Sequence, residues 1–307
     1  MRIMVTGSTG FVGSALCRLL ERHCFEIVLP VRQVTKPKQV FVGDFKNNID
    51  WSSHLNLCDA VIHLASLVHQ PRNSYDDFYS VNVEATINLA RQAAKKGVKR
   101  FVYLSSIKVN GDKTEAGQPF NSDSAEHPVG AYAVTKSIAE KALINIGVET
   151  GMEVVIIRPP LVYGIGVKGN LNTLLTALQL NIPMPFGSIK YNRRSLVYVE
   201  NLADFILCCI KSKANLNATK FLVSDNTDVS TFELINLLAL SLNKRCFQFN
   251  VDKRILSGIF HAIGRDDIRL RLLENLQVDV KKNLDLLGWT PPYTIQDGFL
   301  SLKTEKI

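Results

Sequence analysis

Short apolar runs alternate with longer segments of helical periodicity through the first half of the chain. The runs are continuously apolar, which is typical of strands buried on both faces of a sheet. Such strands joined by helices predict a parallel sheet with helices on both faces. The expected strands are residues 2–7, 26–32, 58–66, 99–106 and 153–160, and the expected helices are residues 10–23, 81–98 and 131–151.

The pattern becomes less regular after about residue 160, where prolines and glycines are frequent. We therefore expect a doubly wound Rossmann-type α/β domain over residues 1–160, completed by returning segments near 190–225. Residues 161–307 are expected to form mainly a small C-terminal lobe that binds a substrate. Two further helices and one strand are expected in this half, at residues 198–213, 230–244 and 219–225 respectively.

Composition narrows the class of protein. The 307 residues are 46% hydrophobic, enough for a large buried core. No apolar run approaches the roughly 18 residues that a membrane span needs, and the N-terminus lacks the apolar core of a secretory signal. The six cysteines show neither a C-x-x-C pair nor zinc spacing, so buried free thiols are expected. These features predict a cytoplasmic protein with no membrane span and no metal.

The net charge of +8 leaves nucleic acid, a membrane surface and an anionic small molecule open as partners. The basic residues are spread along the chain, and only short pairs such as Lys95-Lys96 and Arg193-Arg194 occur. A nucleic-acid-binding protein usually concentrates such residues among stacking aromatic side chains. The distribution therefore disfavours nucleic acid and favours a small substrate that carries phosphate.

The sequence GSTGFVG, with Gly7, Gly10 and Gly13, lies between the first expected strand and the first expected helix. A tight turn needs glycine, and a pyrophosphate approaches a backbone only where no side chain blocks it. The N-terminus of the following helix then offers N–H donors and the positive end of its dipole. This arrangement predicts a dinucleotide-binding turn, and a glycine-rich turn without a ligand is the alternative.

The second expected strand ends without the acidic residue that commonly holds the adenosine ribose 2′-OH. It ends at Arg32, whose guanidinium suits the 2′-phosphate of NADP. NADP is therefore the preferred cofactor and NAD the alternative, while a plain surface cation is the other interpretation of Arg32. Asp44 is a candidate for capping the adenine side, with a simple turn residue as its alternative.

Three motifs follow in order: LSSIKVNG at residues 104–111, AYAVTK at 131–136 and IIRPPLVYG at 156–164. With the glycine turn, DAVIHLAS and VNVEATIN, they resemble the extended short-chain dehydrogenase/reductase superfamily, and best its nucleotide-sugar epimerase/reductase branch. The resemblance extends over nearly the whole chain. It implies an NAD(P)-dependent oxidoreductase that acts on a UDP-sugar. Relatives commonly pair through two helices, so a homodimer is a further expectation.

The resemblance assigns catalysis to three residues. Tyr132 and Lys136 match the family's Tyr-x-x-x-Lys pair, and Ser106 matches its catalytic Ser/Thr, with Ser105 as the rival. A phenol with the ordinary pKa of about 10 is a poor base at neutral pH. An ammonium one helical turn away and the positive ring of the oxidised nicotinamide stabilise the phenolate. Tyr132 then serves as general acid or base, Lys136 also binds the nicotinamide ribose, and Ser106 holds the substrate oxygen.

The resemblance also assigns the cofactor contacts. Asn82 matches an asparagine in the helix packed under the active site, and Pro159 and Leu161 match the strand end that contacts the nicotinamide. Asn110 stands where the family has the tyrosine of a Val-Tyr-Gly motif. The expected cofactor-binding residues are Gly7, Thr9, Gly10, Phe11, Val12, Gly13, Arg32, Asp44, Leu64, Ala65, Ser66, Asn82, Tyr132, Lys136, Pro159 and Leu161.

Dehydratases of this branch place an Asp-Glu pair directly after the catalytic hydroxyl, whereas Ile107 and Lys108 follow Ser106 here. This departure disfavours 4,6-dehydration and leaves 4-epimerisation or reduction of a 4-keto sugar. An epimerase retains NAD and a reductase usually takes NADPH, so Arg32 favours the reductase. Residues 158–204 resemble bacterial proteins that reduce a UDP-4-keto-6-deoxy-N-acetylhexosamine for surface polysaccharide. A UDP-hexose 4-epimerase with tightly bound NAD is the alternative.

The same block supplies the expected substrate contacts. Arg194, or Arg193 beside it, matches the arginine that grips the nucleotide phosphates through its planar guanidinium. Asn170 opens a helix and either reaches the diphosphate or only caps the helix. Phe186 is expected to pack on uracil, and Arg271 is either a second phosphate contact or a surface arginine.

Two further groups lie near the expected site. Lys108 either meets an anion or faces water. His63 and His69 follow a strand without companions at metal-ligand spacing, so ordinary histidines are expected and no metal.

Overall fold

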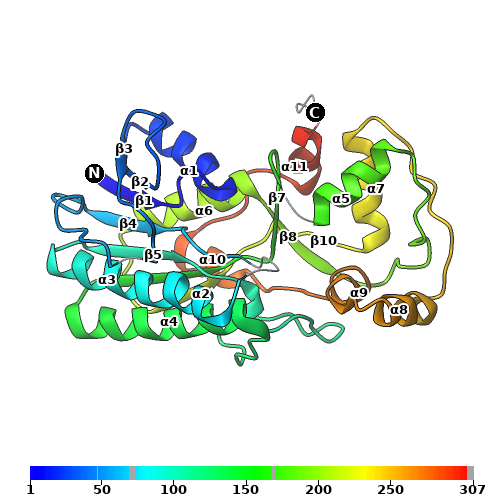
Figure 1. The fold of residues 1–307 in the computed structure, drawn as a ribbon. Helices are drawn as coiled ribbons and strands as arrows, with labels where there is room; N and C mark the ends of the chain where they lie inside the picture. The colour runs from blue at the N-terminus through cyan, green and yellow to red at the C-terminus, as the bar shows by residue number, and fades with distance from the viewer. Residues whose placement is uncertain (47, 69–72, 168–169, 303–307) are drawn as a thin grey trace.

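The sheet predicted from the apolar runs is present in the computed structural model, which describes residues 1–46, 48–68, 73–167 and 170–302. Its seven strands have the order β3-β2-β1-β4-β5-β6-β9, and all neighbouring pairs are parallel. Helices cover both faces (Figure 1), so the Rossmann-type doubly wound α/β fold is confirmed. The strands are β1 (Arg2–Thr6), β2 (Glu26–Val31), β3 (Gln39–Phe41), β4 (Ala60–His63), β5 (Arg100–Leu104), β6 (Glu153–Arg158) and β9 (Thr219–Leu222).

Successive strand residues enter two separate hydrophobic clusters, one on each face of the sheet. In β1, Ile3 and Val5 belong to one cluster and Met4 to the other, and β6 repeats the alternation. Successive side chains of a strand point to opposite faces. The continuous apolar runs of the sequence therefore arise because both faces are buried.

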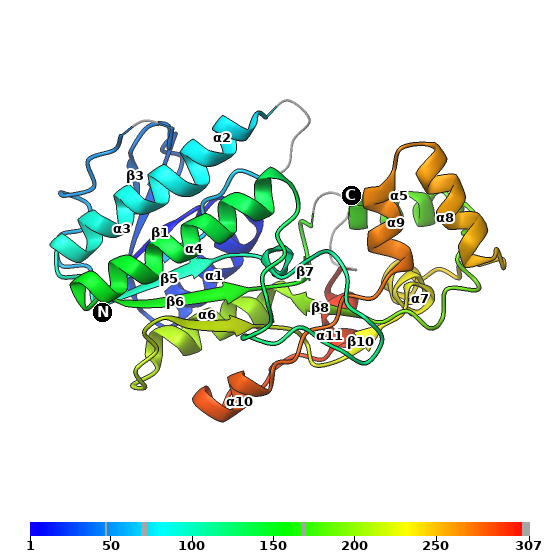
Figure 2. The same cartoon turned by 90° about the horizontal axis from the view of Figure 1, so that it is seen from below.

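Two pairs of helices form the outer layers. On one face α1 (Phe11–Arg22) packs against α6 (Val199–Lys211), and on the other α3 (Ala85–Lys95) packs against α4 (Gly130–Thr150). Figure 2 shows α3 and α4 side by side across the sheet. None of the helices that the structure describes is long and apolar enough to cross a lipid bilayer.

The C-terminal lobe contains a small second sheet in the order β10-β8-β7 and lies to the right in Figure 1. The chain enters the lobe after β6, returns to the main sheet through α6 and β9, and then enters the lobe again. The domain limits inferred from the sequence stay a prediction. The elements of the second half are β7 (Leu161–Tyr163), α5 (Asn170–Gln179), β8 (Arg194–Tyr198), β10 (Asp228–Val229), α7 (Thr231–Ser241), α8 (Lys253–Ala262), α9 (Asp266–Leu273), α10 (Lys281–Leu287) and α11 (Ile295–Ser301).

The helix predicted for residues 81–98 begins earlier than expected. A capping box, in which Ser74 and Asp77 each accept the other's backbone N–H, starts α2 (Tyr75–Tyr79). A π-helical turn, η1 (Ser80–Glu84), then leads into α3. Apolar periodicity missed this start because the cap and the first turn are polar.

Candidate active site

The glycine turn joins β1 to α1 and leaves no room for side chains. Gly7 has a φ of +72°, and a Cβ on it would lie 2.7 Å from the backbone N of Ala65. A Cβ on Gly13 would lie 2.1 Å from the carbonyl O of Gly7. Glycine is therefore required at both positions, because any side chain would push the strand, the helix and the neighbouring loop apart.

The N-terminus of α1 is open to an anion. Its N-cap residue is Gly10, no side chain caps the helix, and the first turn carries no acidic residue. Thr9 is exposed, and the buried hydroxyl of Ser8 has no hydrogen-bond partner within the described part of the chain. Phe11 and Val12 pack partly against the core. Free N–H groups, the helix dipole and an unpaired hydroxyl fit the pyrophosphate of a dinucleotide.

The loop after β4 passes beside Gly7 and is held by Asn82, which is buried in η1. The Asn82 side chain accepts the N–H of Leu67 at 2.8 Å and donates to its carbonyl O at 3.1 Å. It also donates to Thr135 Oγ1 on α4 at 3.3 Å. Asn82 thus ties the loop expected to contact the cofactor to the helix that carries the expected catalytic pair. Three residues of this loop are expected cofactor contacts, and all three are half-buried: Leu64, Ala65 and Ser66.

Arg32 is exposed immediately after β2, at the carboxyl edge of the sheet where the adenosine ribose is expected. Asp44 is exposed, and its carboxylate accepts the N–H of Lys46 at 3.0 Å. Asp44 therefore closes its own turn, as the alternative interpretation anticipated, and a contact with adenine stays a prediction.

Tyr132 and Lys136 lie one turn apart on α4 beside the end of β5. The Lys136 side chain is buried, at 1% exposure, and its Nζ donates to the Leu104 carbonyl O at 2.8 Å. This Nζ is 4.5 Å from the ring centroid of Tyr103 and 6.0 Å from that of Tyr132. The hydroxyl of Ser106, just after β5, lies near enough to the phenol of Tyr132 to lower its pKa. The structure thus brings the three expected catalytic residues together.

Burial shifts both titratable groups of the pair toward their neutral forms. It raises the pKa of Tyr132 to about 12, while the nearby hydroxyl of Ser106 acts in the opposite direction. It lowers the pKa of Lys136 to about 7, against the attraction of the Glu140 carboxylate. The protonation of both groups therefore responds strongly to any charge that binds beside them, as acid–base catalysis requires.

A buried ion network lies below this pair, and sequence reasoning missed it. Glu140, one turn beyond Lys136, accepts from Arg158 Nε at 2.9 Å and from the hydroxyl of Ser105. Arg158 ends β6 and donates through Nη1 to the side chain of Asn110 at 3.0 Å. Ser105, the rival for the catalytic hydroxyl, is therefore committed to this network. The signal was available, because a charge inside an apolar helix or strand needs a buried partner.

Three further expected residues follow β5 and β6 in the chain. Pro159 is buried after β6, and its carbonyl O accepts the N–H of Ile107 at 3.0 Å. Leu161 begins β7 and is 41% exposed, so it has surface to offer a cofactor ring. Lys108 pairs with Asp112 at 2.9 Å, and a contact of Lys108 with a bound anion stays a prediction.

Arg194 is more deeply buried than the resemblance suggested. It is 6% exposed, and its Nη1 donates to the carbonyl O atoms of Leu270 and Glu274 at 3.0 and 3.1 Å. Burial, and then the nearby charge of Arg271, lower the pKa of Arg194 to about 10. Arg271 itself is exposed on α9, and Arg193 is half-buried with its Nη1 3.6 Å from Glu233. The expected phosphate contact of Arg194 stays a prediction.

Phe186 is 5% exposed and belongs to the larger hydrophobic cluster. Its ring supports the lobe and has little surface left for uracil, so the stacking contact is not supported by this position. Asn170 is the first residue of α5, as expected, but its side chain lies outside the described part of the chain. His69 also lies outside it.

Both ring nitrogens of His63 are hydrogen-bonded to hydroxyl groups. It is buried between Thr6 Oγ1 at 2.7 Å and Thr86 Oγ1 at 2.9 Å. Burial, and then the charge of Lys136, lower its pKa to about 3. Among the residues described, no group of three or more His, Cys, Asp or Glu side chains could hold a metal ion. The six cysteines are free, and Cys24 is exposed, unlike the buried thiols expected.

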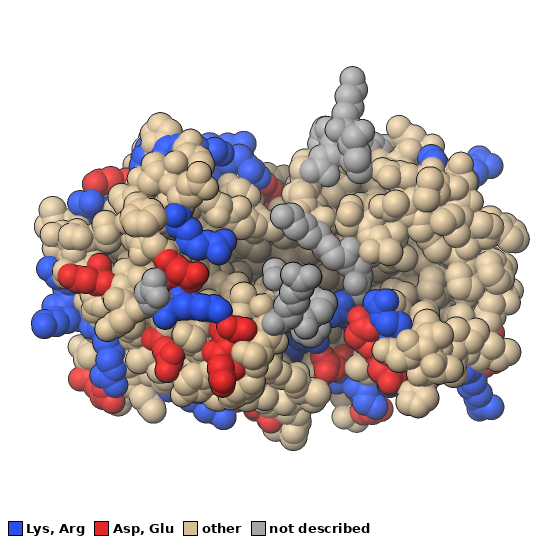
Figure 3. All heavy atoms as spheres, viewed as in Figure 1, with Lys and Arg blue, Asp and Glu red and all other residues tan. Residues whose placement is uncertain are grey.

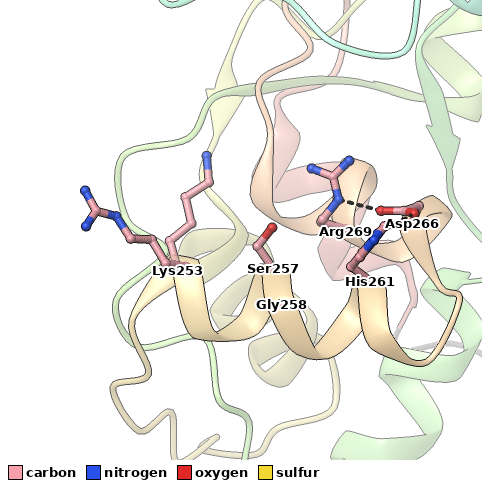
Figure 4. A pocket seen from close by; sticks show the side chains of 7 residues that line it. Lys253, Ser257, Gly258, His261, Asp266 and Arg269 are labelled. Atoms are coloured by element: carbon pink, nitrogen blue, oxygen red, sulfur yellow. Dashed lines mark hydrogen bonds and ion pairs between the residues drawn. The ribbon is translucent and has the colours of Figure 1, made fainter.

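Basic and acidic side chains are intermixed over the face seen in Figure 3, where the surface is hollowed between the main domain and the C-terminal lobe. A separate hollow of about 500 Å³ lies between α8 and α9 (Figure 4). There Arg269 pairs with Asp266 at 2.7 Å, and Lys253 pairs with Glu274 at 3.1 Å. We assign this hollow no part in the chemistry, since its residues come from neither α4 nor the main sheet.

The fold and the site together define an enzyme of the dinucleotide-dependent short-chain dehydrogenase/reductase class. The chain belongs to the NAD dependent epimerase/dehydratase family, whose sequence profile matches residues 3–223.

The relatives include proteins named as epimerases and a protein named as a reductase. The chain is 41% identical over 308 residues to a UDP-glucose 4-epimerase of Vibrio cholerae, covering 97% of this chain and 93% of that protein. It is 27% identical over 322 residues to a GDP-6-deoxy-D-mannose reductase of Pseudomonas aeruginosa, covering 99% and 96%. The crystal structure of a Bacillus cereus UDP-glucuronic acid 4-epimerase with NAD has a TM-score of 0.80 at 20% identity, covering 98% of this chain and 97% of that one.

Proposed function

We propose that the protein is an NAD(P)-dependent oxidoreductase acting at C4 of a UDP-sugar, and that it reduces the 4-keto group of a UDP-6-deoxy-N-acetyl-4-hexulose with NADPH. The observation that carries the proposal is the group formed by Ser106, Tyr132 and Lys136 beside an open glycine turn. A phenol, a hydroxyl and an ammonium in this arrangement suit proton transfer to an alcohol or carbonyl oxygen.

The side chains divide the work of the reaction between them. When bound, the reduced nicotinamide supplies the hydride for the carbonyl carbon. Tyr132 donates its phenolic proton to the carbonyl oxygen, and the hydroxyl of Ser106 holds that oxygen beside the phenol. The ammonium of Lys136 stabilises the phenolate that remains, which lowers the cost of the proton transfer.

The residues after Ser106 support redox chemistry without dehydration. Ile107 is buried and Lys108 is paired with Asp112, so neither is a carboxyl group able to remove water from the sugar. Arg32 supports NADPH as the cofactor, because an exposed guanidinium at the end of β2 suits a 2′-phosphate.

The diphosphate is proposed to lie near Arg194 and Arg271. Burial, and then the charge of Arg271, lower the pKa of Arg194, and an anion beside both arginines would offset the repulsion between them. Arg271 is the exposed member and is proposed to make the direct contact, while Arg194 fixes the end of α9.

A 4-epimerase with tightly bound NAD is the second candidate, supported by the 41% identity to the relative named UDP-glucose 4-epimerase. The same phenol would remove the proton from the 4-hydroxyl and return it after the hydride reaches the other face of the sugar. A homodimer, common among relatives, stays a prediction for either enzyme.

One experiment separates the two candidates. The purified protein is mixed with NADPH and the product of a UDP-N-acetylglucosamine 4,6-dehydratase, and the absorbance of the reduced cofactor is followed. Oxidation of NADPH that depends on the keto sugar supports the reductase. Interconversion of UDP-hexoses without added cofactor, together with no oxidation of NADPH, would replace it with the epimerase.

A further inference from the structure

One buried guanidinium connects three elements of the active site. Arg158 is fully buried at the end of β6, and its Nε and Nη2 donate to Glu140 on α4. Its Nη1 donates to Asn110 after β5 at 3.0 Å, and its Nη2 also donates to Glu126 at 2.6 Å. Ser105, the residue before the catalytic serine, donates to Glu140 as well. The network therefore fixes β5, α4 and β6 relative to one another.

Asn110 closes the short turn that presents Ser106. Ser106 is the N-cap of the 3-10 turn η2 (Ile107–Val109), and Asn110 is its C-cap. The Asn110 side chain is fully buried, accepts from Arg158 and donates to the Ser124 carbonyl O at 3.1 Å. Both ends of the turn are thus anchored. Asn110 anchors one end from the position at which the family has a tyrosine.

At its centre the network has one positive side chain between two negative ones. Arg158 faces two carboxylates, Glu126 and Glu140, and Lys220 and Lys141 approach only Glu126. Glu140 is also the carboxylate whose attraction acts on Lys136. The other titratable groups around Lys136 are the phenols of Tyr132 and Tyr103, and the buried imidazole of His63.

We propose that Asn110, Arg158 and Glu140 are positioning residues, which hold the Ser106 hydroxyl beside the Tyr132 phenol and favour the charged form of Lys136. This proposal rests on the function proposed above for the same site. A role in stability alone would not require polar groups here, since well-packed apolar residues often replace a buried ion pair without loss. The network instead places one carboxylate a helical turn from the catalytic ammonium.

The charge part of the proposal is tested with Glu140→Gln. Without the carboxylate, Lys136 loses its proton at lower pH, so the alkaline limb of the kcat profile should move down by about one pH unit. Glu149→Gln is the matched control, because it removes the same charge from an exposed position of α4 and should leave the limb unchanged. An unchanged limb in a folded Glu140→Gln variant would overturn this part.

The same charge effect can be measured without turnover. NMR of protein labelled with ¹³C at lysine Cε, with the Lys136 signal assigned through Lys136→Arg, gives the pKa of Lys136 directly. A pKa lowered in Glu140→Gln and unchanged in Glu149→Gln supports the network even if the wild type reduces no keto sugar, in which event only the proposed function fails. Equal pKa values of Lys136 in both variants would show that Glu140 does not set its charge, whatever the enzyme reduces.

The geometric part is tested with Asn110→Ala, which leaves the ion pair in place if Glu140→Gln does not fold. We expect kcat to fall by about tenfold with the Kd for NADPH within about twofold of wild type. In a Ser106→Ala background the same change should have almost no further effect, because the hydroxyl that it positions is gone. An equal loss in both backgrounds would show that Asn110 does not act through Ser106.

Discussion

At the scale of single residues, the proposed catalytic pair of Tyr132 and Lys136 depends on charges supplied by its neighbours. Burial makes the Tyr132 phenol a weaker acid and the Lys136 ammonium less stable, so neither works alone at neutral pH. The hydroxyl of Ser106 and the charge of Glu140 act against these two shifts. The charge of Lys136 therefore depends on Glu140, a residue to which the proposed mechanism gives no contact with the substrate.

Replacement of Tyr132 by phenylalanine removes the proton donor and little else. We expect Tyr132→Phe to lower kcat by about a thousandfold, in the usual range for loss of a general acid, with the Kd for NADPH nearly unchanged. Steady-state kinetics and cofactor titration measure the two effects. Tyr191→Phe, at a strongly exposed tyrosine, is the control. Turnover at the wild-type rate in Tyr132→Phe would remove this residue from the mechanism.

Arg32 decides the proposed cofactor preference. Arg32→Ala should raise the Kd for NADPH by about tenfold or more, the loss typical of a hydrogen bond to a charged group, and change that for NADH much less. Fluorescence titration with both cofactors measures the difference. Arg22→Ala removes a comparable exposed charge from the end of α1 and should affect neither. Equal losses for the two cofactors in Arg32→Ala would contradict a 2′-phosphate contact.

At the scale of elements, the sequence predicted those structural features that depend on residues within a single segment. The glycine turn, the strands of the main sheet except β3, and the Tyr132–Lys136 helix follow from patterns within one segment, whereas the short β3 lies in a polar stretch that gave no signal. The link between Asn110, Arg158 and Glu140 joins three segments, so no single stretch of sequence reveals it. The burial of Phe186 in the hydrophobic core could not be predicted from the sequence, because an aromatic ring suits both a core position and stacking on a nucleobase.

One glycine in α1 and one in α8 provide a matched pair of substitutions. Gly13→Ala places a Cβ against the Gly7 carbonyl, so the turn must move. We expect the melting temperature to fall by more than about 5 °C and dinucleotide binding to be lost. Gly258→Ala, in open space within α8, should raise the melting temperature by about 2 °C, because alanine favours the helix. Calorimetry compares the two, and a stable, cofactor-binding Gly13→Ala variant would refute the close approach.

At the scale of the whole molecule, the buried His63 makes stability depend on pH. Its pKa is about 3 in the folded protein, lowered by burial and then by Lys136, against 6.5 in the unfolded chain. Between these values the unfolded chain binds the extra proton, so stability falls as the pH falls. The contribution of neutral His63 is fully present only above about pH 6.5.

His63→Gln should therefore flatten the acid side of the stability profile. We expect the wild type to lose more melting temperature between pH 7 and pH 5 than the variant does, since glutamine has no proton to gain. Thermal unfolding at a series of pH values measures the slopes. His127→Gln, at an exposed histidine, should keep the wild-type slope. Identical slopes in all three proteins would exclude His63 as the cause.

The strand order also affects how the chain folds while it emerges from the ribosome. β9 completes the sheet beside β6, but the chain passes through β7, α5 and β8 before β9 is synthesised. Until Phe221 and its neighbours emerge, β6 has an unpaired edge and part of the core is uncovered, features that attract chaperones and promote aggregation. We expect a gene fragment that stops before Thr219 to encode Ser106, Tyr132 and Lys136, the proposed catalytic residues, and still to yield an insoluble product.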